Sequence, residues 1–173
     1  MAQPAQPRDQ IIRYVQRSLG DARGQLAALQ GGATEVVNVD MAAGALAIGQ
    51  QNHQLGGLTG ARFLAHDLFK SWGKVKRMGP YDIVVADPPS YQKGSFVATK
   101  DYARVVRRLP DLLASGGQAL LCLNAPEIPE QFLRDVATAE APDLRFVRRL
   151  DNPAMFADVD PQRALKVMLF QMS

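Results

Sequence analysis

A turn of five residues, Asp87-Pro88-Pro89-Ser90-Tyr91, combines a carboxylate, a hydroxyl and a phenol with two consecutive prolines. The prolines have no N–H to donate and a fixed φ angle, so they stiffen the turn and keep it out of helix interiors and sheet ladders. A carboxylate on such a rigid backbone can accept a hydrogen bond from a substrate amine or hydroxyl. We therefore expect a reaction centre here; the alternative is a tight strand-to-helix turn with a capping Asp.

The residues before this turn predict a buried strand. Residues 82–86 are Asp-Ile-Val-Val-Ala, a short apolar run rich in β-branched side chains, which is typical of a central strand in a parallel sheet. Ligands bind at the carboxyl ends of the strands in open α/β sheets. The position of the turn therefore favours a ligand site over a purely structural corner.

Two earlier predicted strands also end at an acid, one at Asp40 and one just before Asp67. Because the carboxyl ends of parallel strands meet at one edge of a sheet, we expect Asp40, Asp67 and Asp87 to face one crevice. An acid in the position of Asp40 commonly accepts hydrogen bonds from a ribose diol. Asp67 could receive an exocyclic amine, and Leu68 could cover the face of a purine.

These strands belong to a regular alternation. From residue 35 the order is β-α-β-α-β-α-β-α-β-β, which indicates a parallel sheet covered by helices. The last two strands have no helix between them, so we expect a hairpin. The fold class is α/β, a Rossmann-like, doubly wound, mostly parallel sheet with an antiparallel C-terminal strand. The expected strands are 35–40, 61–65, 82–86, 118–123, 144–150 and 165–171, and the expected helices are 41–55, 68–78, 100–114 and 129–141.

The N-terminal segment has a different character. Residues 9–19 carry apolar side chains at close to helical spacing, which predicts a helix, and Gly20 ends it. We therefore expect two parts. The first is an irregular or helical segment at 1–26, and the second is the globular domain at 27–173.

Composition excludes several classes of protein. Of 173 residues, 47% are hydrophobic and 21% are charged, which argues against a disordered or fibrous chain. No apolar run approaches the roughly 20 residues of a membrane helix, and the N-terminus has no apolar signal-peptide core. One cysteine, Cys122, and two histidines provide neither an internal disulfide nor a metal site. We expect a cytoplasmic protein without a metal or a membrane partner, and the oligomeric state stays open.

Basic residues occur in groups along a chain whose formal net charge is +3. Such groups can neutralise phosphates, or they can be solvated helix faces, and one group alone does not decide between the two. The groups are Lys70, Lys74, Lys76 and Arg77; Arg104, Arg107 and Arg108; and Arg145, Arg148 and Arg149.

The chain resembles the class I S-adenosylmethionine-dependent methyltransferases, and most of all the methyltransferase domain of 23S ribosomal RNA (large-subunit) methyltransferases. The resemblance covers residues 27–171. Four stretches carry it: AALQGGATEVVNVDMAAGALAIGQQNHQL, RFLAHDLFK, YDIVVADPPSYQKGSF and GGQALLCLN.

This resemblance implies S-adenosyl-L-methionine as the cofactor and RNA, in particular ribosomal RNA, as the partner. It places the cofactor ribose at Asp40 and the adenine amine at Asp67. The implied cofactor-binding residues are Asp40, Met41, Asp67, Leu68 and Asp87. The implied catalytic residues are Asp87, Pro88, Pro89, Ser90 and Tyr91, and the implied substrate contacts are Lys93 and Asn124.

The residue at Asn124 bears on the acceptor atom. Family members that methylate carbon 5 of cytosine carry a nucleophilic cysteine at or near this position. Cys122 instead lies inside a predicted strand, where it should be a buried and inert small hydrophobe. We therefore expect transfer to a base nitrogen, such as that of a guanine, with Asp87 orienting the amine and Tyr91 stacking on the flipped base.

The family's first strand and glycine-rich cofactor loop are not recognisable before residue 27. Either this first strand is altered, or it is missing and the chain is a truncated or non-catalytic methyltransferase fold that binds RNA or protein. A nicotinamide dehydrogenase is a weaker candidate, because no G-x-G-x-x-G stands between a strand and a helix.

Overall fold

A seven-stranded sheet organises the computed structural model, which describes residues 13–17, 23–88, 91–92, 96–152 and 160–173, with side chains from residue 27 onward except at 91–92. Its strands are β1 (Arg13–Arg17), β2 (Glu35–Asp40), β3 (Ala61–Ala65), β4 (Tyr81–Ala86), β7 (Leu113–Leu123), β8 (Leu144–Leu150) and β9 (Lys166–Met172). A separate hairpin consists of β5 (Tyr91–Gln92) and β6 (Phe96–Val97). The helices are α1 (Arg23–Gln30), α2 (Ala43–Leu55), α3 (Leu68–Met78), α4 (Ala98–Val106), α5 (Leu109–Leu112) and α6 (Gln131–Glu140).

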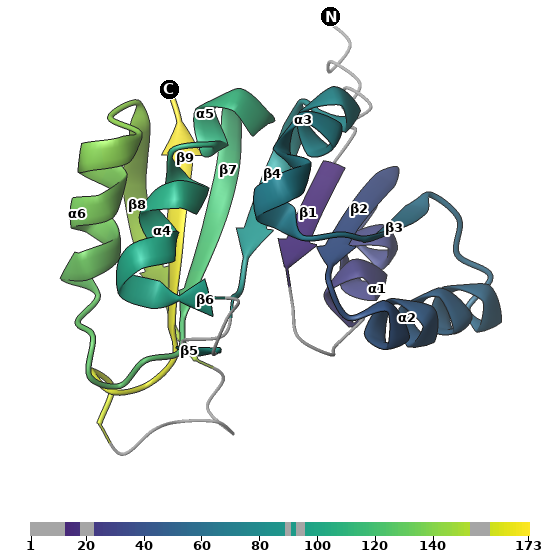
Figure 1. Cartoon of the computed structure of the whole chain (residues 1–173), viewed down its shortest axis with the longest axis horizontal. Coiled ribbons are helices and arrows are strands. Elements are labelled where there is room, and N and C mark those ends of the chain that lie inside the picture. The colour runs from purple at the N-terminus through teal and green to yellow at the C-terminus, as the bar shows by residue number, and fades with distance from the viewer. Residues whose placement is uncertain (1–12, 18–22, 89–90, 93–95, 153–159) are drawn as a thin grey trace, which may run out of the picture.

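The strand order is β3-β2-β1-β4-β7-β9-β8 (Figure 1). β1 pairs in parallel with both β2 and β4, and the pairs β2–β3 and β4–β7 are parallel as well. β9 lies between β7 and β8 and is antiparallel to both. The predicted doubly wound sheet with an antiparallel C-terminal strand is therefore confirmed, and its strand order reverses between β1 and β4.

Residues 13–17 differ from the expectation. The helix expected over residues 9–19 is wrong here, because Arg13–Arg17 is β1, a central strand. Tyr14 and Val15 favour strands, and ladders on both sides with β2 and β4 outweigh a helical spacing that extends over only a few turns. The first strand is therefore present, with a sequence that is unusually polar for its place. The remainder of the expected helix lies outside the described residues.

Alternation along the strands separates two layers of apolar contacts. Val37 and Val39 of β2 belong to the larger cluster, together with side chains of α3 to α6. Val36 and Val85 belong to the smaller cluster, which α1 covers from the other face. Figure 1 shows α3 to α6 on the near side of the sheet, over β4 and the strands that follow it.

Proline and glycine set two boundaries on the way to the site. The helix expected over residues 100–114 is divided into α4 and α5, with Pro110 in the first turn of α5, where its missing N–H costs nothing. Residues 115–117, which separate the expected helix 100–114 from the expected strand 118–123, lie within β7, at a shift in the β4–β7 register. A Cβ atom on Gly117 would come within 2.8 Å of the Ala114 carbonyl oxygen, so this close approach of the backbone needs glycine.

The part of the chain that the structure describes contains neither a membrane-spanning helix nor a metal-binding group of side chains. None of its helices is long and apolar enough to cross a membrane. Its His, Cys, Asp and Glu side chains form no group of three or more that could hold a metal ion.

Candidate active site

The carboxyl ends of β2, β3 and β4 bring the three predicted acids to one edge of the sheet. Asp40 ends β2, while Asp67 and Asp87 follow β3 and β4 within two residues. β1 lies between β2 and β4, so Asp40 and Asp87 flank its carboxyl end, about 10 Å apart by two strand spacings. The His66 amide donates to the Asp40 carbonyl oxygen at 3.0 Å, which ties the segments after β2 and β3 together.

Asp40 is buried but keeps acceptor capacity. It is 6% exposed, and its Oδ1 accepts a hydrogen bond from the Ala42 amide at 2.7 Å. No hydrogen bond from the described residues occupies Oδ2, so this oxygen can accept from hydroxyls of a ligand. Met41 follows with an apolar side chain that is 46% exposed and can cover a flat base. The pair suits the nucleoside half of a nucleotide-like cofactor.

Asp67 and Leu68 begin α3. Asp67 caps the helix, because its Oδ1 accepts from the Phe69 amide at 2.9 Å, and Oδ2 lies 3.8 Å from the Lys70 ammonium. The Leu68 side chain does not face the edge: it is 6% exposed and lines a small apolar cavity with Trp72. What Leu68 can offer a ligand is its main-chain amide, since the first N–H groups of a helix have no intrahelical partners.

Asp87 is half-buried, and this burial raises the pKa of its carboxyl. The last register pair of β4 and β7 is Ala86 with Leu121, which puts Asp87 beside Cys122. Pro88 is buried and lines the same cavity as Leu68, so the turn is anchored in the core. A carboxylate that has lost part of its water gains from a hydrogen-bond donor, so Asp87 is suited to a substrate amine.

The rest of the turn is described only in part. Pro89, Ser90 and Lys93 lie outside the described residues, and Tyr91 is described through its backbone alone. That backbone pairs with Val97 in the β5–β6 hairpin, an element that the sequence did not predict. Two-residue strands are too short to show the alternation that identifies a strand.

Phe96 anchors this hairpin. It is 1% exposed, its ring stacks on Phe69 at 6.4 Å between centroids, and it meets Tyr102 edge-on at 5.5 Å. The Val97 amide donates to Oδ2 of Asp101 at 2.8 Å. Because α3 and α4 supply these partners, the segment after the proline turn has a rigid base.

Cys122 is close to the site but inert. It is 8% exposed, and burial, together with the Asp87 carboxylate, raises the pKa of its thiol to about 12. Only the thiolate is a nucleophile, so Cys122 is unreactive near neutral pH. Its carbonyl accepts a hydrogen bond from the buried Tyr102 hydroxyl, which holds the end of β7. Asn124, two residues on, is exposed and offers an amide rather than a thiol.

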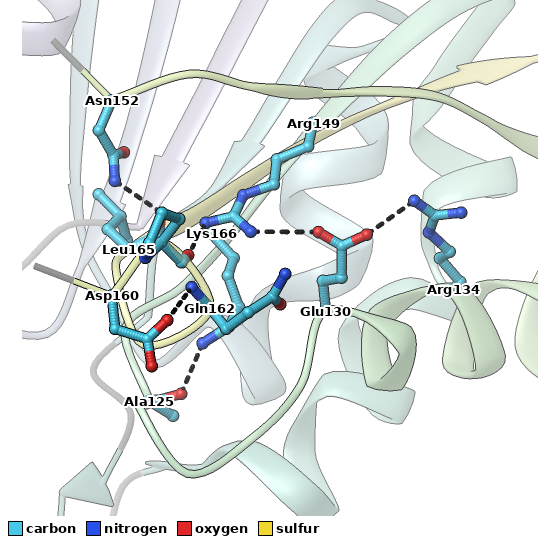
Figure 2. A network of polar contacts seen from close by, with 10 residues as sticks. Ala125, Glu130, Arg134, Arg149, Asn152, Asp160, Gln162, Leu165 and Lys166 are labelled. Carbon is cyan, nitrogen blue, oxygen red and sulfur yellow. Dashed lines mark hydrogen bonds and ion pairs between the residues drawn. The ribbon is translucent and has the colours of Figure 1, made fainter. Parts of the chain in front are cut away.

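Lys166 is a site-edge residue that the sequence did not predict. It is fully buried, and its ammonium donates to the Ala125 carbonyl oxygen at 2.9 Å (Figure 2). Burial, with Arg149 as a further cause, lowers its pKa. β9 is antiparallel to β7, so its first residue lies at the edge where β7 ends. Lys166 therefore holds the main chain directly after Asn124. The sequence signal for Lys166 is a lysine at one of the alternating positions of an apolar strand whose side chains are buried.

Glu130 extends this network toward α6. Its carboxylate accepts hydrogen bonds from the guanidinium groups of Arg134, at 2.8 Å, and Arg149, at 3.2 Å (Figure 2). Arg149 also donates to the Pro161 carbonyl oxygen at 2.6 Å. The chain after β7, the end of β8 and the approach to β9 are thus connected beside the site.

Comparison with known proteins identifies the fold that carries these groups. The family model for S-adenosylmethionine-dependent methyltransferases matches residues 13–171. The chain belongs to this family. Ribosomal RNA large subunit methyltransferase I of Aeromonas hydrophila is 37% identical over 120 residues, which cover 66% of this chain and 30% of the relative. The protein of the same name from Cronobacter sakazakii is 29% identical over 139 residues, covering 75% of this chain and 35% of the relative.

Solved structures agree with the family. A methyltransferase complexed with S-adenosylhomocysteine has a TM-score of 0.81 at 22% identity, covering 94% of this chain and 46% of its own. TrmN from Thermus thermophilus has a TM-score of 0.66 at 20% identity, covering 94% and 44%. The predicted class I methyltransferase fold is confirmed, and S-adenosylmethionine is the cofactor of the family. The chain spans about a third of the length of the curated relatives that it matches.

Proposed function

We propose that the protein transfers a methyl group from S-adenosylmethionine to a base nitrogen of RNA, ribosomal RNA in particular, in the cytoplasm. The observation that carries the acceptor class is a half-buried Asp87 beside a thiol that stays protonated. A carboxylate can accept from an amine, whereas attack on carbon 5 of cytosine needs a thiolate. Two relatives named as ribosomal RNA large subunit methyltransferases support the RNA class.

The residues at the carboxyl edge fit the nucleoside half of the cofactor. The bound cofactor supplies a methyl group on a sulfonium sulfur. Asp40 would accept ribose hydroxyls with its open oxygen, and the exposed Met41 would cover the adenine. Asp67 and the main-chain amide of Leu68 would meet the edge of the adenine ring.

Transfer between a sulfonium and a nitrogen is an in-line displacement, so orientation supplies most of the catalysis. The new N–C bond forms as the S–C bond breaks, and the nitrogen then gives up a proton. Asp87 would accept a hydrogen bond from the amine and take up or pass on this proton. Tyr91 would stack on a base extruded from the RNA, and Asn124 and Lys93 would contact base and phosphate.

A non-catalytic module that binds RNA or protein is the second candidate from the sequence. It depended on the loss of the first strand, and β1 stands between β2 and β4. The enzyme is therefore the better supported of the two.

Calorimetric titration with S-adenosylmethionine and S-adenosylhomocysteine tests the cofactor site. We expect saturable binding that Asp40→Ala weakens and that the distant control Arg145→Ala leaves unchanged. Absence of heat at millimolar cofactor would contradict the enzyme.

A second experiment tests the acceptor. Ribosomal RNA fragments are incubated with methyl-labelled cofactor, and the digested nucleosides are identified by mass spectrometry. We expect a label on a base nitrogen; a label on carbon 5 of cytosine would overturn the assignment of Asp87.

A further inference from the structure

One strongly cationic surface borders the site, on α3, α4 and the start of α5. Seven cations belong to it against three carboxylates, so its net charge is +4 on a chain whose formal net charge is +3. The remaining residues therefore sum to a charge of −1. We call this surface the α3–α4 basic face; its cations are Lys70, Lys74, Lys76, Arg77, Lys100, Arg104 and Arg108, and its carboxylates are Asp67, Asp101 and Asp111.

The fold joins two basic groups that are separate in the sequence. The Arg104 guanidinium lies 3.8 Å from the centroid of the Phe69 ring, which places α4 against α3. The Lys76 ammonium lies 2.6 Å from Asp111, and Arg108 lies 3.6 Å from the same carboxylate. Sequence alone left phosphate contact and solvated face equally open. The fold brings both groups onto neighbouring helices, which favours phosphate contact because the cations gather instead of dispersing.

The outer side of α3 carries three cations about one turn apart. Lys70, Lys74 and Arg77 follow the i, i+4, i+7 spacing, so they share one side of the helix over about 10 Å. All three are exposed, and α3 contains no acid. Like charges at this spacing destabilise a helix, so an anionic partner would stabilise it.

These three cations are poorly neutralised within the chain. Lys70 lies 3.8 Å from Asp67, and 84% of its side chain is exposed. Lys74 contacts an imidazole nitrogen, the Nε2 atom of His66 at 2.8 Å, rather than a carboxylate. Arg77 has no ion pair or hydrogen bond among the described residues. Their charges are therefore available to phosphates.

The row of Lys70, Lys74 and Arg77 starts at the candidate active site. Asp67 caps α3, and Lys70 follows one turn later. Figure 1 shows α3 running from the edge where β4 ends back across the near face. A nucleic acid with one base in the site can therefore continue its backbone along α3. Between α3 and α5 lies a groove of about 230 Å³, lined by Trp72 and rimmed by Lys76 and Arg108.

We propose that the α3–α4 basic face binds the sugar-phosphate backbone of the substrate RNA, with Lys70, Lys74 and Arg77 as its main phosphate contacts. The proposal rests on the proposed function, methylation of RNA. Such contacts position a nucleic acid without reading its sequence. They would supply salt-dependent affinity and leave the choice of base to the proline turn.

Binding of a ribosomal RNA fragment, measured by fluorescence anisotropy over a range of salt concentrations, tests the face. The double variant Lys74→Gln/Arg77→Gln removes two contacts and leaves Lys70, which lies closest to the cofactor site. The slope of log affinity against log salt should become shallower by about 1.4 for single strands to 1.8 for duplex. The matched control Arg145→Gln/Arg148→Gln removes two exposed cations from β8 and should leave the slope unchanged.

Cofactor titration and methyl transfer separate this proposal from the proposed function. We expect the double variant to bind S-adenosylmethionine like wild type and to show a raised KM for RNA with an unchanged kcat. Equal slopes for the double variant and wild type, with RNA still methylated, would overturn the basic face alone. An equal change of slope in the two double variants would also overturn the assignment of the basic face. Cofactor binding without RNA binding by wild type would overturn RNA as the substrate, and the face with it.

Discussion

Replacing the buried Lys166 by methionine separates two roles of this side chain, stability and positioning of the loop after β7. Methionine keeps most of the unbranched stem and removes the ammonium that donates to Ala125 at 2.9 Å (Figure 2). The main chain beside Asn124 then loses its tether. We expect Lys166→Met to fold with little change in stability and to lose catalytic efficiency.

Two opposing effects set the stability of this variant. Loss of a hydrogen bond from a charged donor costs about 1.5–3 kcal/mol. Removal of a buried ammonium relieves a desolvation penalty of several kcal/mol, which Glu127 and Glu130 offset in part and Arg149 increases. The second effect at least equals the first. The free energy of unfolding should therefore stay within about 1 kcal/mol of wild type or exceed it.

The difference in stability between Lys166→Met and wild type should depend on pH in a definite direction. Because burial lowers the pKa of Lys166, the folded state holds this proton less tightly than the unfolded state. At neutral pH the buried charge destabilises the folded protein. As the pH rises through the lowered pKa toward the unfolded value of about 10.4, this penalty disappears. The advantage of Lys166→Met over wild type should therefore shrink as the solution becomes alkaline.

Urea denaturation of both proteins across this pH range measures the stability, and steady-state kinetics measure the positioning. We expect kcat/KM for RNA to fall about 10- to 100-fold, as a small misplacement of a substrate loop produces, with cofactor affinity unchanged. Arg145→Met, at an exposed arginine of β8, is the control and should change neither quantity. A loss of more than about 3 kcal/mol at neutral pH would refute the balance of the two effects. Wild-type kcat/KM would refute the positioning role.

Three further substitutions test the site. Asp87→Asn should lower kcat about 10²- to 10⁴-fold. Burial raises the pKa of Asp87, so its ionised form destabilises the folded state. Asp87→Asn should therefore have a higher melting temperature than wild type at neutral pH, and this difference should vanish below the ordinary carboxyl pKa of about 3.9. A lower melting temperature of the variant at neutral pH would contradict the destabilising role of the ionised carboxylate. Cys122→Ala should retain methyl transfer. In the native protein, a thiol with a pKa of about 12 should react with iodoacetamide roughly 10³-fold more slowly than a free thiol. Rapid alkylation of the folded protein would contradict this expectation. Phe96→Ala should lose about 3–5 kcal/mol of stability and should also lower kcat, because Phe96 holds the β5–β6 hairpin. The control Phe170→Ala, equally buried but away from the site edge, should lose stability alone. Equal effects of the two variants on kcat would contradict the role of Phe96 as the anchor of the hairpin.

Elements whose local pattern agrees with their environment could be predicted from the sequence. β2, β3 and α3 have the expected bounds, because apolar β-branched runs and a basic amphipathic segment each match their place in the fold. β1 could not be predicted, since Arg13–Arg17 is polar at three of its five positions and its place in the sheet depends on pairing with two neighbouring strands. Propensity is a weak guide where tertiary pairing dominates.

The candidate site shows the same division. Asp40, Asp67 and Asp87 could be placed on one edge because topology alone brings strand ends together. Leu68 could not, because the side-chain direction at a helix start depends on packing, and here it fills the core. The contact of Lys166 with Ala125 spans 41 residues and requires β9 to enter between β7 and β8. No pattern within one segment carries that information.

The spacing between Asp40 and Asp87 follows from the strand that the sequence concealed. If β2 and β4 were neighbours, Asp40 and Asp87 would lie about 5 Å apart, and two carboxylates would repel each other there. β1 doubles this spacing, so one acid can serve a nucleoside while the other serves a base, with room between them for the group that is transferred. This contribution comes from the main chain, which explains why a sequence as polar as Arg-Tyr-Val-Gln-Arg suffices in the middle of the sheet. The separation of the proposed cofactor side from the proposed substrate side therefore depends on backbone pairing rather than on a recognisable motif.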